Sequence, residues 1–304
     1  MIELQGLTKV FGRGARATCA VDDLTCTVET GVVTGFLGPN GAGKSTAMRL
    51  ILGLDRPTSG TATVAGQQYR NLRDPLRTVG ALLDARGTHP SRSVRAHLGW
   101  IAASNRIPAK RIDEVLGIVG LQDVAAKKSG ELSLGMSQRL GIAAALLGDP
   151  PVLMFDEPVN GLDPEGIRWV RTLMRELAAE GRTVLVSSHL LAEMANTADR
   201  LIVIGRGRLV AATTVDEFVA RSRADVVRVR SPQLELLRNA LLDAGIEVTD
   251  DVDALSVNGV SAEVIGELAA RNHLTLYELT PQRASLEEAY LQLTEDVTDY
   301  RSAS

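Results

Sequence analysis

The chain has 304 residues, a net charge of −4 and 45% apolar residues, enough for a large core and more than one domain. It has no long basic run, which argues against the electrostatic footprint of a nucleic-acid-binding protein. No window approaches the roughly eighteen consecutive apolar residues of a membrane span, and the N-terminus alternates like a strand, unlike a signal peptide. We therefore expect a cytosolic chain, for which a membrane-bound partner stays open. Cys19 and Cys26 lack metal-ligand spacing and are interpreted as small apolar residues.

A glycine-rich loop lies between an apolar run, residues 32–37, and a helix-like run, residues 47–52. Its members are Gly38, Pro39, Asn40, Gly41, Ala42, Gly43, Lys44, Ser45 and Thr46. Glycines let backbone N–H groups converge on phosphate oxygens, and a helix N-terminus favours negative charge. Lys44 would reach the outer phosphates, Ser45 would bind Mg²⁺, and Thr46 would donate to an inner phosphate. The sequence thus predicts a nucleotide site; a surface glycine loop that binds nothing is the structural alternative.

Two adjacent acids, Asp156 and Glu157, follow a second apolar run at residues 151–155. A buried parallel strand would bring Asp156 to the carboxyl edge of a sheet, beside the phosphate loop, where its carboxylate can hold Mg²⁺. Side chains alternate along a strand, so Glu157 points elsewhere and can address a water molecule. Glu157 is the candidate general base. A solvated strand end with two exposed acids is the alternative.

A further run that is predicted to be buried, residues 183–188, ends at His189. Another parallel strand would deliver this imidazole to the same sheet edge, close to the γ-phosphate, where it can orient the water or Glu157. His189 is therefore a catalytic candidate. No chemistry is assigned to the other histidines, which are His89, His97 and His273.

Ser133 stands in N-cap position at the start of a predicted helix, between the phosphate loop and the acid pair. The order of phosphate loop, this segment, acid pair, residues 160–163 and the Ser188-His189 pair resembles the nucleotide-binding subunit of ATP-binding cassette (ABC) transporters. The resemblance covers roughly the first two-thirds of the chain. It implies ATP and Mg²⁺ as cofactors and an α/β P-loop NTPase cassette over residues 1–221. This cassette has a mixed-sheet core, an antiparallel β subdomain and a small helical subdomain at about residues 85–150.

The resemblance assigns roles to further residues. Ser133 and Gly135 belong to the family's signature, which contacts the ATP held by the opposite subunit; a capped helix N-terminus suits this as a second anion site. The signature departs from the usual form, because Leu134 and Met136 stand where glycine and glutamine are common.

Two loop positions also match the family. Phe11 lies where the family stacks an aromatic ring on adenine, with an ordinary core residue as the alternative. Asp163 matches the acid of the family's inter-subunit loop, which couples the two ATP sites. An N-cap for the helix after Pro164 is its structural alternative, and both roles are compatible.

The predicted strand at residues 79–83 ends in Asp84, where most relatives have the glutamine that touches Mg²⁺ and senses the membrane partner. A carboxylate can ligate Mg²⁺ as an amide oxygen does, but it is shorter and adds charge near the γ-phosphate. An acid here, like the unusual signature, resembles the branch that serves ABC-2-type exporters of antibiotics, lantibiotics and drugs. The resemblance therefore implies export.

By the same resemblance, residues 84–105 of the helical subdomain receive a membrane-spanning permease that is encoded separately. This places the chain peripherally at the cytoplasmic face of the membrane. Arginines and Trp100 in this region are compatible with a docking face, but a solvated basic loop followed by a helix would look the same.

No nucleotide motif recurs in the C-terminal part, predicted to be a separate α+β accessory domain over residues 222–304. Hydrophobic periodicity and turn signals there predict a ferredoxin-like order of elements. These elements are strands at 226–230, 246–249, 254–257 and 275–278 and helices at 233–244, 262–271 and 285–293. Such a domain can sense a ligand, brace a dimer or stabilise the chain, and no residue pattern chooses among these roles.

Together these features predict an ATP hydrolase that powers a membrane exporter and works as two chains with two ATP molecules between them. One phosphate loop and one signature per chain require a second ATPase subunit; a homodimer is simplest and a heterodimer with a related ATPase is allowed. A soluble cassette ATPase acting on ribosomes or DNA is the alternative, although neither a second cassette nor a long coiled-coil insertion is present. An immunity or sensor ATPase is a further alternative.

Overall fold

The computed structural model describes residues 1–84, 87–221, 225–283 and 286–294. They form two compact units, Met1–Val215 and Asp216–Glu295, and each is described by itself. The sequence placed the boundary between residues 221 and 222. The division falls slightly earlier, so helix α8 (Val215–Arg221) belongs to the second unit except for its first residue.

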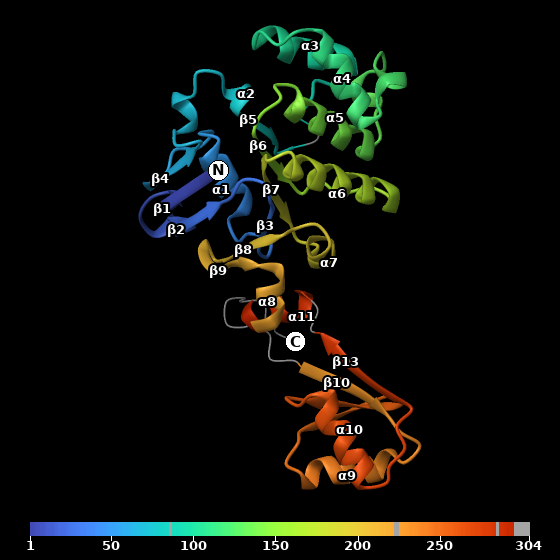
Figure 1. Ribbon diagram of the computed structural model, residues 1–304. Helices are drawn as coiled ribbons and strands as arrows, with labels where there is room; N and C mark the ends of the chain where they lie inside the picture. Colours follow the sequence, from blue (N-terminus) through green and yellow to red (C-terminus); the bar gives the residue numbers. More distant parts are fainter. Residues whose placement is uncertain (85–86, 222–224, 284–285, 295–304) are drawn as a thin grey trace. The chain divides into compact units, whose positions relative to one another are not determined.

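The first unit is built on a six-stranded sheet with the order β5-β6-β7-β3-β8-β9 (Figure 1). The first five of these strands are parallel, and β9 pairs antiparallel with β8. This confirms the predicted mixed sheet. The strands are β3 (Val33–Leu37), β5 (Val79–Leu82), β6 (Val152–Asp156), β7 (Thr183–Ser188), β8 (Arg200–Gly205) and β9 (Arg208–Thr214).

The central strands read as nearly continuous apolar runs because both of their faces are covered. Every residue of β3 and β7 is buried, as are the first four of β6. The parallel register pairs Leu37 with Ser188 and Asp156 with Ser187. The chain segments that follow β3, β6 and β7 therefore emerge at the same edge of the sheet.

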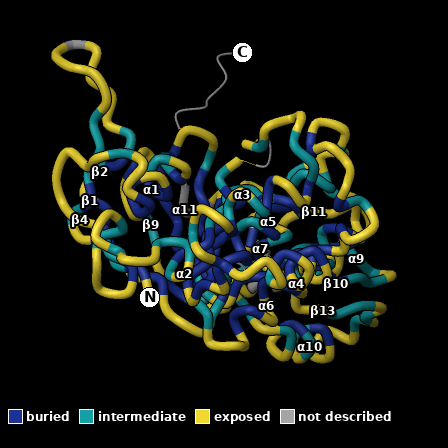
Figure 2. The backbone as a smooth tube through the Cα atoms, turned by 90° about the horizontal axis from the view of Figure 1, so that it is seen from above, coloured by how far each residue is buried: buried dark blue, intermediate teal, exposed yellow. Residues whose placement is uncertain are grey.

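A second, antiparallel sheet has the order β2-β1-β4 and confirms the predicted antiparallel subdomain. Its strands are β1 (Ile2–Phe11), β2 (Thr18–Val28) and β4 (Ser59–Val64). Leu4 and Val64 from this sheet share one apolar core with Met48 of helix α1 (Lys44–Ile51) and Met154 of β6. Figure 2 shows the connection between β1 and β2 as an exposed loop.

Helices α3, α4 and α5 gather beside the short helix α2 and strand β5 and form the predicted helical subdomain (Figure 1). The long helix α6 follows β6 and packs against β7, and the short helix α7 follows β7. The bounds are α2 (Pro75–Thr78), α3 (Val94–Ser104), α4 (Lys110–Val119), α5 (Leu134–Leu146), α6 (Pro164–Ala179) and α7 (Leu191–Ala195). Among the described residues, no helix has the length and hydrophobicity that crossing a bilayer requires.

The second unit contains a four-stranded antiparallel sheet with the order β11-β12-β10-β13. With two intervening helices this confirms the predicted ferredoxin-like arrangement. Val227, Leu241, Leu255 and Ile265 belong to its own apolar core, between the sheet and the helices. The elements are β10 (Asp225–Arg230), α9 (Leu234–Asp243), β11 (Val248–Asp251), β12 (Ala254–Asn258), α10 (Ala262–Arg271), β13 (Glu278–Arg283) and α11 (Leu286–Thr294).

The prediction for the last strand was wrong. It was expected at residues 275–278, but β13 begins at Glu278 and continues through Pro281, which pairs with Val227. Proline disfavours a central strand but is tolerated at an edge, and β13 is an edge strand. The final helix lies close to its predicted place, although its predicted first residue, Ser285, is outside the described residues.

Candidate nucleotide-binding site

The phosphate loop runs from the end of β3 directly into α1, and its glycines are required by the backbone. Gly41 and Gly43 have φ values of 81° and 102°, in the left-handed region that favours glycine. A Cβ atom on Gly43 would lie 2.2 Å from the carbonyl oxygen of Ala20, and one on Gly38 would lie 2.6 Å from that of Ile204. The loop is therefore pressed against β2 and β8, and no larger residue fits at these positions.

The loop lines a hollow of about 330 Å³ at the carboxyl edge of the sheet. The acid pair at the end of β6 lines the same hollow, as the strand order predicted. The complete lining is Ala20, Pro39, Asn40, Gly41, Ala42, Gly43, Lys44, Ser45, Thr46, Leu83, Asp156 and Glu157. One concave site thus combines a glycine-rich loop, a lysine, two hydroxyl groups and two carboxylates.

Lys44 is only 7% exposed, although it carries an ammonium group. Its Nζ donates to the carbonyl oxygens of Gly38, at 2.5 Å, and Pro39, at 3.3 Å. Burial lowers the pKa of Lys44, while the nearby charges of Glu157 and Asp156 act in the opposite direction. A buried cation in a hollow with loop N–H groups favours a multiply charged anion such as a nucleotide phosphate.

Asp156 is held by Ser187 of the neighbouring strand β7. The Ser187 hydroxyl donates to Asp156 Oδ1 and accepts the Glu157 N–H at 3.1 Å. The second carboxylate oxygen can ligate a cation, and the Ser45 hydroxyl lines the same hollow. A carboxylate and a hydroxyl are hard oxygen donors that fit Mg²⁺.

Glu157 and His189 meet across the ends of β6 and β7. His189 Nδ1 lies 2.8 Å from Glu157 Oε2, a hydrogen-bond distance that fixes the two side chains relative to each other. Glu157 has a φ of 49°, which is uncommon for a residue with a side chain. The carboxylate is partly exposed at the mouth of the hollow, where it can reach a water molecule.

Ser133 and Gly135 lie elsewhere in the chain's own fold. Ser133 caps α5, and its Oγ accepts the Met136 N–H at 3.2 Å, as the sequence predicted. Neither Ser133 nor Gly135 belongs to the lining of the phosphate-loop hollow. The structure of one chain therefore does not bring the signature to its own phosphate loop.

Asp163 is the N-cap of α6, and its Oδ1 accepts the Gly166 N–H at 2.8 Å. The capping role expected from the sequence is confirmed. Phe11 is 43% exposed at the end of β1, with Lys9 Nζ 4.9 Å from the centre of its ring. It pairs with Thr18 of β2, two residues before Ala20 in the hollow. Phe11 itself is not among the residues that line the hollow; the partner strand β2 contributes Ala20.

Asp84 follows Leu83, which lines the hollow, but Asp84 itself is exposed and is absent from the lining. Ser45 and Asp156, by contrast, belong to this lining. Residues 85 and 86, within the predicted docking region, are outside the described residues.

Sequence reasoning missed two residues of the site. Ser187 bonds to the Asp156 carboxylate and to the Glu157 N–H, and its signal was a small polar residue near the end of a predicted buried strand, two positions before His189. Gln138 is 6% exposed on α5, and its Nε2 lies 3.4 Å from the carbonyl oxygens of Glu157 and Asn160. In the sequence, only its place in the predicted helix, one turn after Leu134, could have pointed to Gln138.

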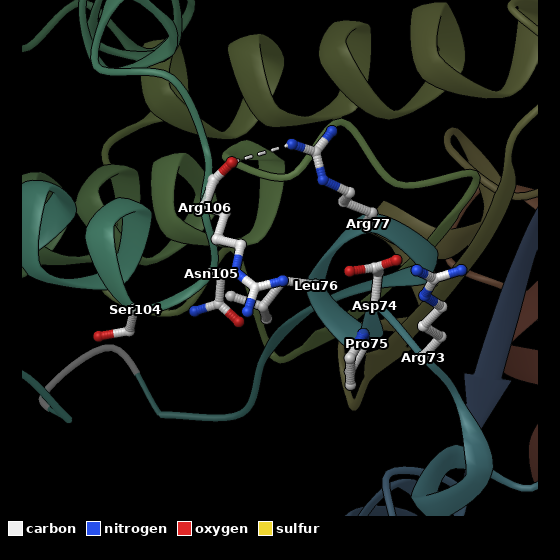
Figure 3. Close-up of a pocket in the computed structure, with 8 residues that line it drawn as sticks. All are labelled: Arg73, Asp74, Pro75, Leu76, Arg77, Ser104, Asn105 and Arg106. Atoms are coloured by element: carbon white, nitrogen blue, oxygen red, sulfur yellow. Dashed lines mark hydrogen bonds between the residues drawn. The ribbon is translucent and has the colours of Figure 1, made fainter.

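A separate hollow of about 220 Å³ lies between α2 and the end of α3 (Figure 3). Arg73, Arg77 and Arg106 line it together with Asp74, and Arg77 Nη2 donates to the carbonyl oxygen of Arg106 at 3.2 Å. None of its lining residues belongs to the phosphate-loop hollow, and its surplus of guanidinium groups suits an acidic or carbonyl-rich ligand.

The fold and the hollow together define a P-loop ATPase of the cassette type, and comparisons with known proteins agree. Residues 21–160 match the family described as ABC transporter, and residues 225–287 match a Domain of unknown function (DUF8746). The chain is 35% identical over 302 residues to the bacitracin transport ATP-binding protein BcrA of Bacillus licheniformis, covering 96% of this chain and 97% of that protein.

It is also 35% identical over 321 residues to the daunorubicin/doxorubicin resistance ATP-binding protein DrrA of Streptomyces peucetius, covering 99% and 94% of the two chains. Among solved structures it resembles the ATP-binding cassette MJ0796 in a dimeric post-hydrolysis state bound to ADP and Pi. The TM-score is 0.65 at 25% identity, over 70% of this chain and 98% of that one. The chain belongs to the ABC transporter family, as one of its ATP-binding and ATP-hydrolysing subunits.

Proposed function

We propose that the chain energises a membrane exporter of antibiotics or drugs by hydrolysing ATP at the phosphate-loop hollow. The contact between Glu157 and His189 at the mouth of this hollow carries the chemical part of the proposal. The likeness to BcrA and DrrA over almost the whole chain, including the second unit, supports the transport part. The first unit would act as the ATPase, and the second as an accessory domain.

The residues in and near the hollow have separate roles in the proposed reaction. Glu157 accepts a proton from the attacking water, and His189 holds the carboxylate and donates toward the γ-phosphate. Lys44 and the loop N–H groups bind the phosphates, and Phe11 stacks on the adenine. Mg²⁺ held by Ser45 and Asp156, with Asp84 as the further ligand that the sequence suggested, would neutralise phosphate charge.

We propose that the working unit contains two ATPase chains and a separate permease at the cytoplasmic face of the membrane. Ser133 and Gly135 lie outside the hollow of their own chain, so a second chain has to supply them to each ATP. The dimeric state of the related cassette MJ0796 supports this arrangement. A homodimer satisfies it with one kind of chain.

The hollow lined by Arg73, Arg77 and Arg106 is the proposed docking point for the permease. It is lined by α2, which leads directly into β5, and by the end of α3 in the helical subdomain, so a segment bound there contacts both elements. Its guanidinium groups would bind carboxylates or exposed carbonyl oxygens of a cytoplasmic helix end.

Export can be tested in cells that lack this chain and are complemented with wild type or Glu157→Gln. We expect wild type to lower the intracellular accumulation of a bacitracin-type peptide or an anthracycline, and Glu157→Gln to lack this effect at equal expression. Equal accumulation with both variants, for all compounds tried, would contradict export.

Docking can be tested by photo-crosslinking from a single thiol. In a background that carries Cys19→Ser and Cys26→Ala, Ser104→Cys places the probe at the edge of the arginine-lined hollow, and Thr61→Cys, on β4, is the matched control. We expect only the Ser104 probe to capture a membrane protein with several spans. Capture from both sites, or from neither, would remove this hollow as the docking point.

A further inference from the structure

The start of α5 touches the segment that carries Glu157, here called the Glu157 loop (residues 157–162). A Cβ atom on Gly161 would lie 2.0 Å from Leu134 Cδ2, and one on Gly135 would lie 3.1 Å from Leu162 Cδ2. Gly161 also has a φ of 73°. The signature helix and the Glu157 loop of the same chain are therefore in close van der Waals contact, and the unusual Leu134 makes part of it.

One turn further along α5, Gln138 directs its amide into this contact. Its Nε2 donates to the carbonyl oxygens of Glu157 and Asn160, both at 3.4 Å. Its Oε1 is buried with no partner in the described part of the chain. Burying an amide is costly unless it makes hydrogen bonds, so a simple packing role would be served better by an apolar residue of the same size.

The backbone of Glu157 needs to be held. A positive φ at a residue with a side chain is strained and persists only where the surrounding contacts determine it. The Glu157 N–H is bonded to Ser187, and its carbonyl oxygen accepts from the Asn160 N–H at 3.2 Å and from Gln138. Gln138 is thus the contact that ties this strained peptide to α5.

We propose that Gln138 is a positioning residue for the general base: it fixes the Glu157 loop to α5 and thereby aims the Glu157 carboxylate. This inference rests on the proposed function, because it assigns Glu157 its role in hydrolysis. It also gives α5 two tasks at its first turns, since Ser133 at its cap would serve the ATP of the partner chain. Both bonds are at the long end of the hydrogen-bond range.

The test compares Gln138→Met, which keeps the side-chain volume and removes the N–H donors, with Ile142→Val. Ile142 is fully buried on the same helix, and this control removes one methylene group but no hydrogen bond. In the nucleotide-free full-length protein, amide hydrogen exchange of a peptide that covers residues 157–163 should rise at least about fivefold in Gln138→Met, the scale of losing one of its two hydrogen bonds, and stay unchanged in Ile142→Val.

In steady-state assays, Gln138→Met should lower kcat about tenfold and leave KM for ATP within about twofold, because the phosphate loop is intact. Unchanged exchange and unchanged kcat would overturn the inference, as would equal effects of Gln138→Met and Ile142→Val, which would indicate packing alone. The exchange readout does not depend on ATP hydrolysis. If wild type failed to hydrolyse ATP while exchange still rose in Gln138→Met, the proposed function would be wrong. The contact between Gln138 and the Glu157 loop would still be confirmed.

Discussion

At the scale of single residues, the site depends on side chains whose surroundings set their chemistry. Ser187 holds Asp156 and the Glu157 N–H, and His189 holds the Glu157 carboxylate. Each acid thus has its own support on the neighbouring strand β7 or just after it. The Asp156 carboxylate can therefore bind a cation and the Glu157 carboxylate can accept a proton, although the two residues are adjacent in the sequence.

Replacing Glu157 by glutamine should reduce ATP turnover about a hundredfold or more, the scale of losing a general base, and leave ATP binding intact. The amide keeps the size of the side chain and can still meet His189, but it cannot accept the proton. Steady-state hydrolysis and calorimetric ATP titration separate the two effects. Glu180→Gln, at an exposed ion pair with Arg182, is the control; turnover near the wild-type rate in Glu157→Gln would end the assignment.

The two cysteines should differ sharply in reactivity. Burial raises the pKa of Cys26 to about 12, whereas Cys19 is exposed. At pH 8 the native protein should therefore react with a thiol reagent at one position, and the unfolded protein at two. The folded Cys26 thiol keeps its proton up to about pH 12, whereas the unfolded thiol loses it near pH 9. The free energy of unfolding should therefore decrease as the pH rises from about 9 to about 12. Mass spectrometry of labelled peptides identifies which cysteine has reacted. Rapid labelling of Cys26 in the native protein would contradict the prediction.

At the scale of elements, much of the fold could be predicted because the strands carry strong local patterns. The largely apolar runs that end at Leu37, Phe155 and Ser188 predicted buried parallel strands. Because parallel strands end at the same edge of a sheet, this prediction also placed the acids beside the phosphate loop. The predicted position of β13 was wrong because Pro281 interrupts the strand pattern in the sequence, although an edge strand tolerates proline. The contact of Gln138 with the Glu157 loop could not be predicted, because it joins segments by tertiary packing and has no sequence periodicity of its own.

The junction between α5 and the Glu157 loop can be measured with glycine substitutions. Gly161→Ala should destabilise the first unit by about 2–4 kcal/mol, since left-handed strain of about 1 adds to overpacking against Leu134. Gly181→Ala is the matched control, with a φ of 88° but nothing within 4 Å of the added Cβ, and should cost only about 1–2 kcal/mol.

Removing the obstructing side chain should relieve the clash. Leu134→Ala combined with Gly161→Ala should recover about 1–3 kcal/mol relative to the sum of the single changes. Urea unfolding of the four proteins gives this coupling energy. Additive effects would mean that Leu134 and Gly161 do not press against each other.

At the scale of the whole molecule, the chain has two cores that share no residue among the buried clusters described. Both tryptophans, Trp100 and Trp169, lie in the first unit. Tryptophan fluorescence therefore reports on the ATPase unit alone, whereas far-UV circular dichroism reports on both units.

Leu255→Ala should destabilise the second unit by about 2–5 kcal/mol, because it leaves a cavity in that unit's core. We expect the early part of the urea transition seen by circular dichroism to shift to lower urea, and the fluorescence transition and ATP affinity to stay unchanged. Equal shifts of both signals would show that the two units unfold as one.

The close approach of Leu134 to Gly161 has a consequence for how such sequences can diverge. The Leu134 side chain lies where a Cβ at position 161 would go, so the two positions form a linked pair, 27 residues apart. Leucine at 134 should therefore arise after glycine at 161 or together with it. An alignment of relatives should therefore hold very few chains with leucine at 134 and anything but glycine at 161.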